Sequence, residues 1–181
     1  MTYKPLGTFS NQADYFQGFE DWVKEAKYFE GEIQFLNETF KLPYDVEIVI
    51  ADSSYDPDCE YPNAFYFERE IMICYEYISY TNWKFADYFN SVYVDGWTTE
   101  QLNYSTINVI DHTFYHEMGH ALIDIYELPI TGPEESVADQ FSGFILLEFP
   151  YEDDPTNSIG QDAMRDTAID YWLAAEENPD L

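Results

Sequence analysis

The stretch that decides the fold is residues 107–128, which read INVIDHTFYHEMGHALIDIYEL. Its apolar residues recur at steps of three or four, which is the spacing of an amphipathic helix packed on a core. They are Ile107, Ile110, Phe114, Met118, Ala121, Ile125 and Leu128. His116 and His120 fall on nearly the opposite side, where a surface helix would ordinarily carry lysine and glutamate. The pattern predicts a helix that is buried on one side and lines a cleft with the other.

Within this helix, residues 116–120 read His-Glu-Met-Gly-His. Two imidazoles four positions apart share one face, about 6 Å apart along the axis. Both can therefore bind one Zn²⁺ with bonds of about 2 Å. Glu117 then lies beside the metal, where it can take a proton from the attacking water as the general base of a metallopeptidase. The competing interpretation is an ordinary helix with two paired histidines.

A glycine inside this motif predicts a close neighbour. Gly119 costs about 1 kcal/mol relative to alanine in the middle of a helix. We therefore expect another backbone to pass close to it.

A catalytic zinc needs a third protein ligand, and the next predicted helix, residues 133–148, can supply it. Glu135 and Asp139 are four positions apart and share a face of that helix. Glu135 can complete a His₂Glu site, while Asp139 can accept the other ring N–H of a ligating histidine. Glu134 is the fallback ligand. The alternative is that both acids simply complement the helix dipole and face solvent.

The third histidine of the chain is a weaker candidate. His112 lies one turn before His116, but it is about 12 Å from His120 along the axis. That distance is too long for both to bind a metal held by His116. We therefore expect His112 to be a core or supporting residue rather than a ligand.

Taken together, the motifs resemble the thermolysin-type, or gluzincin, zinc metallopeptidases. His116-Glu117-x-x-His120 followed by Glu135-x-x-x-Asp139 matches their ligand pattern, in which the aspartate supports a histidine. Asn63-Ala64-Phe65-Tyr66 resembles their Asn-Ala-Phe-Trp edge strand. This resemblance implies that Asn63 and Ala64 bind the substrate peptide as an added strand.

The wider pattern resembles a small bacterial family described only as candidate metallopeptidases of unknown function. The similarity extends from about Val46 to Phe149 and includes the following segments: Cys59, residues 63–66, residues 73–76, His-Glu-x-Gly-His-Ala-Leu at 116–122 and Glu-Glu-x-x-Ala-Asp-Gln at 134–140. It covers more than half of the chain.

The chain departs from the thermolysin pattern in two respects. The connection from His120 to Glu135 is shorter, so the two helices must be joined tightly. No histidine follows His120, although thermolysin-like enzymes place a transition-state-stabilising histidine downstream of the third ligand. The candidates for that role here are Tyr151, Arg165 and Tyr171, unless the metal alone stabilises the oxyanion.

The remaining pattern predicts an α+β, single-domain, zincin-like fold over residues 1–181. The expected elements are a helical segment at 11–40; a small mixed sheet within 45–77, with a strand at 46–51 and a hairpin of 62–67 and 71–77 turning near Glu68 and Arg69; helical or irregular chain at 81–90; catalytic helices at 99–149; and a final helix at 158–177.

The net charge of the chain limits the classes of molecule that it can bind. Seven basic residues stand against 36 acidic ones, a formal net charge of −29. This balance excludes nucleic-acid binding through phosphate neutralisation and disfavours anionic membranes. It favours neutral or basic peptides as partners and is compatible with a halophilic or marine source. No apolar run is long enough to span a membrane, and we expect a monomer.

The two cysteines, Cys59 and Cys74, flank the predicted hairpin and could form one disulfide. Residues 1–20 lack the pattern of a signal peptide, so either the thiols are reduced in the cytoplasm or the chain is a mature exported form. The family resemblance favours the exported form, periplasmic or secreted, with the disulfide.

These patterns predict a zinc endopeptidase whose substrate is a peptide or protein. Two alternatives differ from it in class. One is a non-catalytic acidic module that mimics nucleic acid or docks a basic partner, with a structural metal or none. The other is a regulatory protease restricted to one partner protein.

Overall fold

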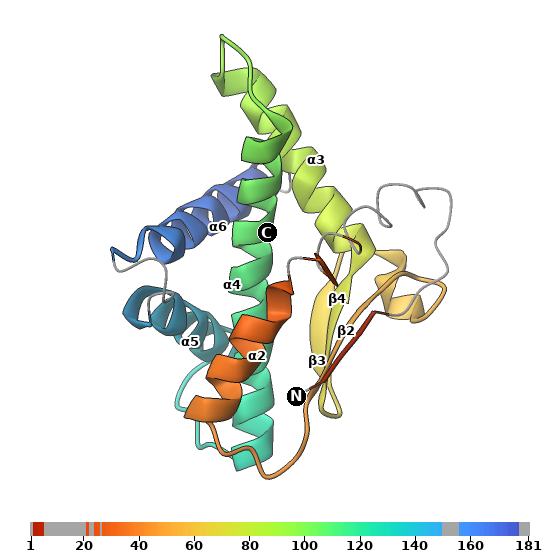
Figure 1. The fold of residues 1–181 in the computed structure, drawn as a ribbon, viewed down its shortest axis with the longest axis vertical. Helices are drawn as coiled ribbons and strands as arrows, with labels where there is room; N and C mark the ends of the chain where they lie inside the picture. Colours follow the sequence, from red (N-terminus) through yellow and green to blue (C-terminus); the bar gives the residue numbers. More distant parts are fainter. Residues whose placement is uncertain (1, 6–20, 22–23, 26, 150–155, 178–181) are drawn as a thin grey trace. The chain divides into compact units, whose positions relative to one another are not determined.

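The computed structural model describes residues 2–5, 21, 24–25, 27–149 and 156–177 (Figure 1). The structure is mixed α+β, as predicted. The chain divides into two compact units: residues 1–77 with 120–129, and residues 78–119 with 130–181. We refer to these as unit 1 and unit 2. None of the described helices is both long and apolar enough to cross a membrane.

Unit 1 contains a four-stranded sheet of β1 (Thr2–Pro5), β2 (Glu47–Ala51), β3 (Ala64–Phe67) and β4 (Glu70–Cys74), in the order β1-β2-β4-β3. β2 pairs in parallel with both β1 and β4, whereas β3 and β4 are antiparallel. The predicted mixed sheet and its edge strand are thus confirmed. Strand β1 was not predicted.

The hairpin of β3 and β4 turns where the sequence indicated. Phe67 pairs with Glu70, which leaves Glu68 and Arg69 as a two-residue loop. Both loop residues have positive φ, 44° and 75°. This is the type I′ pattern, whose twist matches that of the flanking strands.

The second hairpin strand is shorter than predicted. We expected it to reach residue 77, but it ends at Cys74 and helix α3 (Tyr75–Val92) begins at the next residue. Tyr75, Ile78, Phe85 and Phe89 are buried at helical spacing. Their burial outweighs the β propensity of the aromatic residues at positions 75 and 77. Residues 81–90 are accordingly helical.

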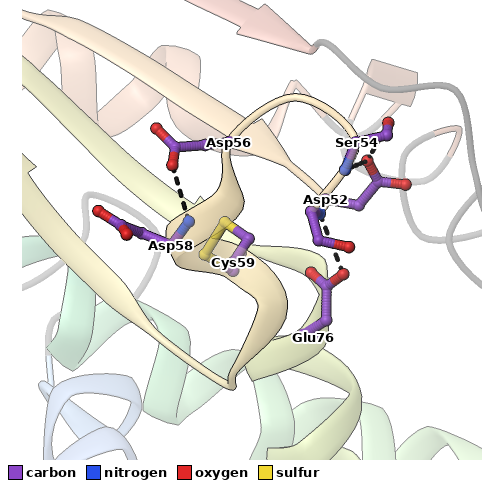
Figure 2. Close-up of a disulfide and its surroundings, with 8 residues drawn as sticks. Asp52, Ser54, Asp56, Asp58, Cys59 and Glu76 are labelled. Atoms are coloured by element: carbon purple, nitrogen blue, oxygen red, sulfur yellow. Dashed lines mark hydrogen bonds between the residues drawn. A yellow bond between two sulfur atoms is a disulfide. The ribbon is translucent and has the colours of Figure 1, made fainter.

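A disulfide joins Cys59 to Cys74, the last residue of β4 (Figure 2). Cys59 lies in the short 3₁₀ helix η1 (Pro57–Glu60), where Asp56 accepts a hydrogen bond from the Asp58 backbone N–H at 2.9 Å. Both cysteines are fully buried in a cluster with Val49, Ala51 and Met72. Closing a loop of 15 residues is worth about 3 kcal/mol in the chain-entropy account. The predicted pairing is confirmed.

Helix α2 (Tyr28–Thr39) confirms the last part of the helical segment predicted at 11–40, and it buries Phe29 and Leu36. Most of the earlier part of that prediction lies outside the described residues.

The long motif helix is α4 (Thr99–Tyr126), followed by α5 (Glu134–Glu148) and α6 (Ser158–Glu177). The predicted bounds of α5 and α6 agree with these to within one residue. Most of the apolar stripe of α4 is buried as expected, but Leu128 lies beyond the helix and is 46% exposed.

Buried polar contacts fix α6 within unit 2. The Asn108 amide of α4 donates to Asp166 at 2.7 Å, and Lys84 of α3 forms an ion pair with Asp170 at 2.6 Å. Both aspartates are nearly inaccessible, with exposed fractions of 2% and 4%. Removing either partner would leave a buried polar group unsatisfied, so α6 has a defined position against α3 and α4.

The predicted close approach at Gly119 is confirmed. A Cβ atom built on Gly119 would lie 2.9 Å from Ala138 Cα and 3.3 Å from Ala138 Cβ. Helices α4 and α5 thus touch backbone to backbone at this point. The contact lies between Glu135 and Asp139 in the sequence of α5.

We expect Gly119→Ala to lower the free energy of unfolding by about 1–3 kcal/mol, because backbone must move to admit the methyl group. Gly143→Ala in α5 is the matched control. Its Cβ would meet only the flexible Met164 side chain, at 3.4 Å for Cε. This control should be neutral or gain up to about 1 kcal/mol from helix propensity. Urea unfolding of both variants measures the difference, and equal stabilities would contradict the packing argument.

Candidate metal centre

The middle of α4 carries the three motif side chains. The His116 side chain is 15% exposed, and Glu117 is buried with 6% exposure. His120 follows one turn later on the same continuous helix and is partly buried. These groups are therefore shielded from bulk water but not sealed from it.

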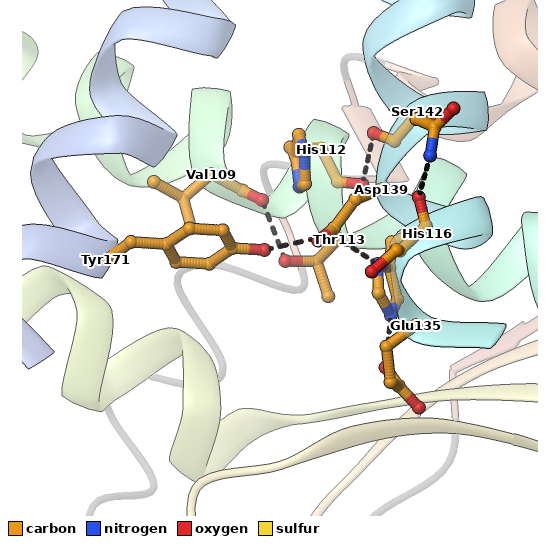
Figure 3. Close-up of polar contacts among 10 residues, drawn as sticks. Val109, His112, Thr113, His116, Glu135, Asp139, Ser142 and Tyr171 are labelled. Atoms are coloured by element: carbon orange, nitrogen blue, oxygen red, sulfur yellow. Dashed lines mark hydrogen bonds and ion pairs between the residues drawn. The ribbon is translucent and has the colours of Figure 1, made fainter. Parts of the chain in front are cut away.

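The His116 ring is held at one nitrogen by α5. Its Nδ1 lies 2.8 Å from Asp139 Oδ1, and Figure 3 shows the two side chains facing each other. An ionised carboxylate can only accept a hydrogen bond, so Nδ1–H donates. In neutral imidazole this leaves the lone pair on Nε2. The contact thus prepares Nε2 to bind a cation.

That nitrogen faces the predicted third ligand. His116 Nε2 lies 3.2 Å from Glu135 Oε2. A nitrogen lone pair and a carboxylate oxygen repel each other unless a proton or a metal ion lies between them. The side chains of His116, His120 and Glu135 each offer a ligand atom, and these atoms all lie within 4.8 Å of one another. The group could therefore hold a metal ion. Glu134, the fallback ligand, is not part of it.

His112 is a buried supporting residue. It is 4% exposed, and burial lowers the pKa of its imidazole to about 4. Its backbone carbonyl accepts a hydrogen bond from Ser142 Oγ of α5 at 2.8 Å. This second contact helps to fix α5 beside α4 (Figure 3). His112 is not among the described side chains grouped closely enough to hold a metal ion.

A tyrosine from α6 also contacts Asp139. Tyr171 Oη lies 3.4 Å from Asp139 Oδ1, and its ring packs edge-on against His112 with centroids 6.0 Å apart. Of the other two oxyanion candidates, Arg165 pairs with Asp162 and Asp166, and Tyr151 lies outside the described residues. Tyr171 was one of three candidates by position, and nothing in the sequence selected it over Tyr151 and Arg165.

The predicted substrate-binding residues lie in unit 1, where Ala64 begins the edge strand β3 and Asn63 precedes it. The Tyr66 hydroxyl of this strand donates to Asp124 of α4 at 2.7 Å. Burial and this bond raise the pKa of Tyr66 to about 12, so the hydroxyl keeps its proton. Asp124 is one helical turn from His120, and β3 is thus attached to the part of α4 that follows His120. Sequence reasoning missed this contact.

A comparison with protein families agrees with this donor set. The profile of the family DUF4344, described as "Putative metallopeptidase", matches residues 10–181. The chain belongs to this family. No curated protein and no solved structure matches this chain significantly. The match covers nearly the whole chain of this metallopeptidase-family protein: all of unit 2, and unit 1 except for residues 1–9, which include β1.

We expect Asp139→Asn to weaken metal binding about 10- to 100-fold, the usual cost of altering the partner of a ligating histidine. Competition between the protein and a chromogenic chelator for Zn²⁺ measures the change. Asp87→Asn, at an exposed position of α3, removes the same charge away from the ligands and should leave affinity unchanged. Unchanged affinity in Asp139→Asn would contradict a supporting role for this carboxylate.

Proposed function

We propose that this chain is a zinc-dependent endopeptidase of the gluzincin type with a zincin-like fold. His116, His120 and Glu135 would hold the Zn²⁺. The observation that carries the proposal is the 3.2 Å separation between His116 Nε2 and Glu135 Oε2. Two ligand atoms of a tetrahedral zinc with bonds of about 2.0–2.1 Å lie about 3.3 Å apart. Two imidazoles and one carboxylate also leave a fourth position open, as catalytic zinc requires.

The bound ion would polarise the scissile carbonyl and acidify the attacking water molecule. Glu117 is assigned the general base. It follows a ligating histidine directly, so it lies next to the ligands without being one of them, and its burial limits competition from bulk water. Its carboxylate accepts the proton from the attacking water and passes it to the leaving amine. Asp139 keeps the His116 ring oriented throughout, through the Nδ1 hydrogen bond.

Tyr171 is the oxyanion donor that the contacts favour. Its hydroxyl lies beside the carboxylate that supports His116, on a helix fixed by buried polar contacts. A phenol keeps its proton at neutral pH and can donate to a developing oxyanion. Tyr171 would thus take the oxyanion-stabilising role that the downstream histidine has in thermolysin-like enzymes.

Strand β3 is assigned the substrate-binding role. The Cys74 backbone N–H donates to the Asn63 carbonyl at 3.1 Å, which marks residues 63 and 74 as a hydrogen-bonded pair. Pairs alternate along an antiparallel ladder, so the next pair, Ala64 with Ile73, directs its backbone groups away from the partner strand. The N–H and C=O of Ala64 therefore point outward from the edge, where an extended peptide can add as a further strand.

The disulfide supports a location in an oxidising compartment, periplasmic or extracellular.

The general base is tested by Glu117→Gln, which keeps the shape of the side chain and removes its basicity. We expect kcat to fall at least about 100-fold on casein or a peptide library, while zinc content stays at one ion per chain. His116→Ala should lose metal and activity together. Full activity in Glu117→Gln, with a substrate that the wild type cleaves, would exclude the proposed base.

The substrate strand is tested by Ala64→Pro, which removes one outward N–H while leaving the ladder to β4 intact. Losing one backbone hydrogen bond should lower kcat/KM about 5- to 10-fold, mainly through KM. Ala64→Ser changes the side chain but keeps the N–H, and it should stay within about twofold of the wild type. The assignment fails if both variants match the wild type on a peptide long enough to span the strand.

A further inference from the structure

Unit 2 contains very few basic residues. This unit, residues 78–119 and 130–181, contains only two basic residues, Lys84 and Arg165. No lysine or arginine occurs at all between positions 85 and 164, a span that includes both ligand-bearing helices. The same two helices and their connection carry nine acidic residues: Glu100, Asp111, Glu117, Asp124, Glu127, Glu134, Glu135, Asp139 and Glu148.

Both basic residues of unit 2 are already engaged by aspartates. Lys84 is 4% exposed and forms its ion pair with Asp170 at 2.6 Å. Arg165 is held by Asp162 and Asp166 through its guanidinium nitrogens, at 2.5 Å and 3.1 Å. Neither side chain can turn to a substrate without taking the ion pair from a buried carboxylate, Asp170 for Lys84 and Asp166 for Arg165.

Among the residues of unit 2 that carry or adjoin the candidate ligands, the formal charge therefore stays negative even with a divalent metal bound. Glu117, Glu134, Glu135 and Asp139 contribute four negative charges, and a divalent ion offsets two of them. Glu135 and Asp139 remain substantially open to solvent, with side chains 76% and 44% exposed. Their field thus reaches a ligand that approaches α5 from solution.

From this distribution of charged residues we infer that the site selects positively charged, internal peptide segments. This inference rests on the proposed peptidase function. A substrate's terminal carboxylate, or its aspartate and glutamate side chains, would meet like charge, since unit 2 has no uncommitted arginine or lysine to pair with them. Lysine and arginine side chains that flank the scissile bond would instead meet carboxylates. The preferred substrate class is a basic, extended peptide cleaved away from its C-terminus.

The test uses three fluorogenic peptides with one neutral central sequence and with flanks of four lysines, four glutamines or four glutamates. Cleavage by the zinc-loaded wild type gives kcat/KM, and fluorescence anisotropy with zinc-loaded Glu117→Gln gives affinity without turnover. At an ionic strength of about 0.01 M, the lysine peptide should exceed the glutamate peptide at least about tenfold in both measurements. Amidation of the C-terminus should leave cleavage of the lysine peptide unchanged or improve it.

A local field is distinguished from the charge of the whole protein by two matched variants. Ser136→Lys places a cation on the exposed first turn of α5, next to Glu135. Asn103→Lys adds the same charge at an exposed position of α4, about 20 Å along the helix axis from His116. Ser136→Lys should reduce the lysine-to-glutamate preference at least about threefold, and Asn103→Lys should reduce it much less.

Equal cleavage of the three peptides would overturn the charge preference and leave the peptidase function intact. Equal effects of Ser136→Lys and Asn103→Lys would also overturn it, because the preference would then reflect only the total charge. If no peptide is cleaved but Glu117→Gln still binds the lysine peptide preferentially, the charge inference holds and the catalytic proposal fails. If none is cleaved and none is bound, both fail.

Discussion

The backbone contact between Gly119 and Ala138 is the constraint on which the rest of the candidate site depends. A Cβ atom at position 119 would come within 2.9 Å of Ala138 Cα, so only glycine allows this approach without a shift. On α4, Gly119 lies between His116 and His120. On α5, Ala138 lies between Glu135 and Asp139. The hydrogen bond from Ser142 to the His112 carbonyl adds a second point of attachment. Two fixed points remove the freedom of α5 to rotate or slide, and its two carboxylates are thereby directed at one imidazole.

Much of the helical part of the fold could be predicted from the sequence because its signals are local. The bounds of α5 and α6 follow from an apolar stripe bounded by proline and polar residues, and these signals act within a few positions. The strand-to-helix junction at Cys74 and Tyr75 carries no such signal. Aromatic residues at 75 and 77 suit a strand by propensity, yet the burial of Tyr75 and Ile78 on one helical face decides the outcome. Strand β1 was missed for a related reason. It has four residues including a proline, and its pairing with β2 joins positions about 45 residues apart in the chain.

The same distinction applies to the candidate site. The spacing of His116 and His120 is a property of one helix, so their shared face was predictable without knowledge of tertiary structure. The placement of Glu135 and Asp139 required the expectation that the next helix folds back, which the short connection favours. Tyr171 was only one of three candidates by position. The sequence could not select it, because its place beside Asp139 depends on how α6 is held by the Asn108–Asp166 and Lys84–Asp170 contacts. The Tyr66–Asp124 bond likewise joins a strand to a helix turn through side chains that carry no motif.

The acidity of the candidate metal ligands and their neighbours also bears on folding. Glu134 and Glu135 begin α5, where the helix dipole favours negative charge, but that effect is worth only about 0.3–1 kcal/mol for each exposed residue. Asp139 follows one turn later, so three carboxylates lie within the first two turns of α5. A divalent cation bound by the folded group would offset part of this negative charge and stabilise the fold in proportion to its occupancy. A divalent cation bound by His116, His120 and Glu135 would therefore help to hold α5 against α4.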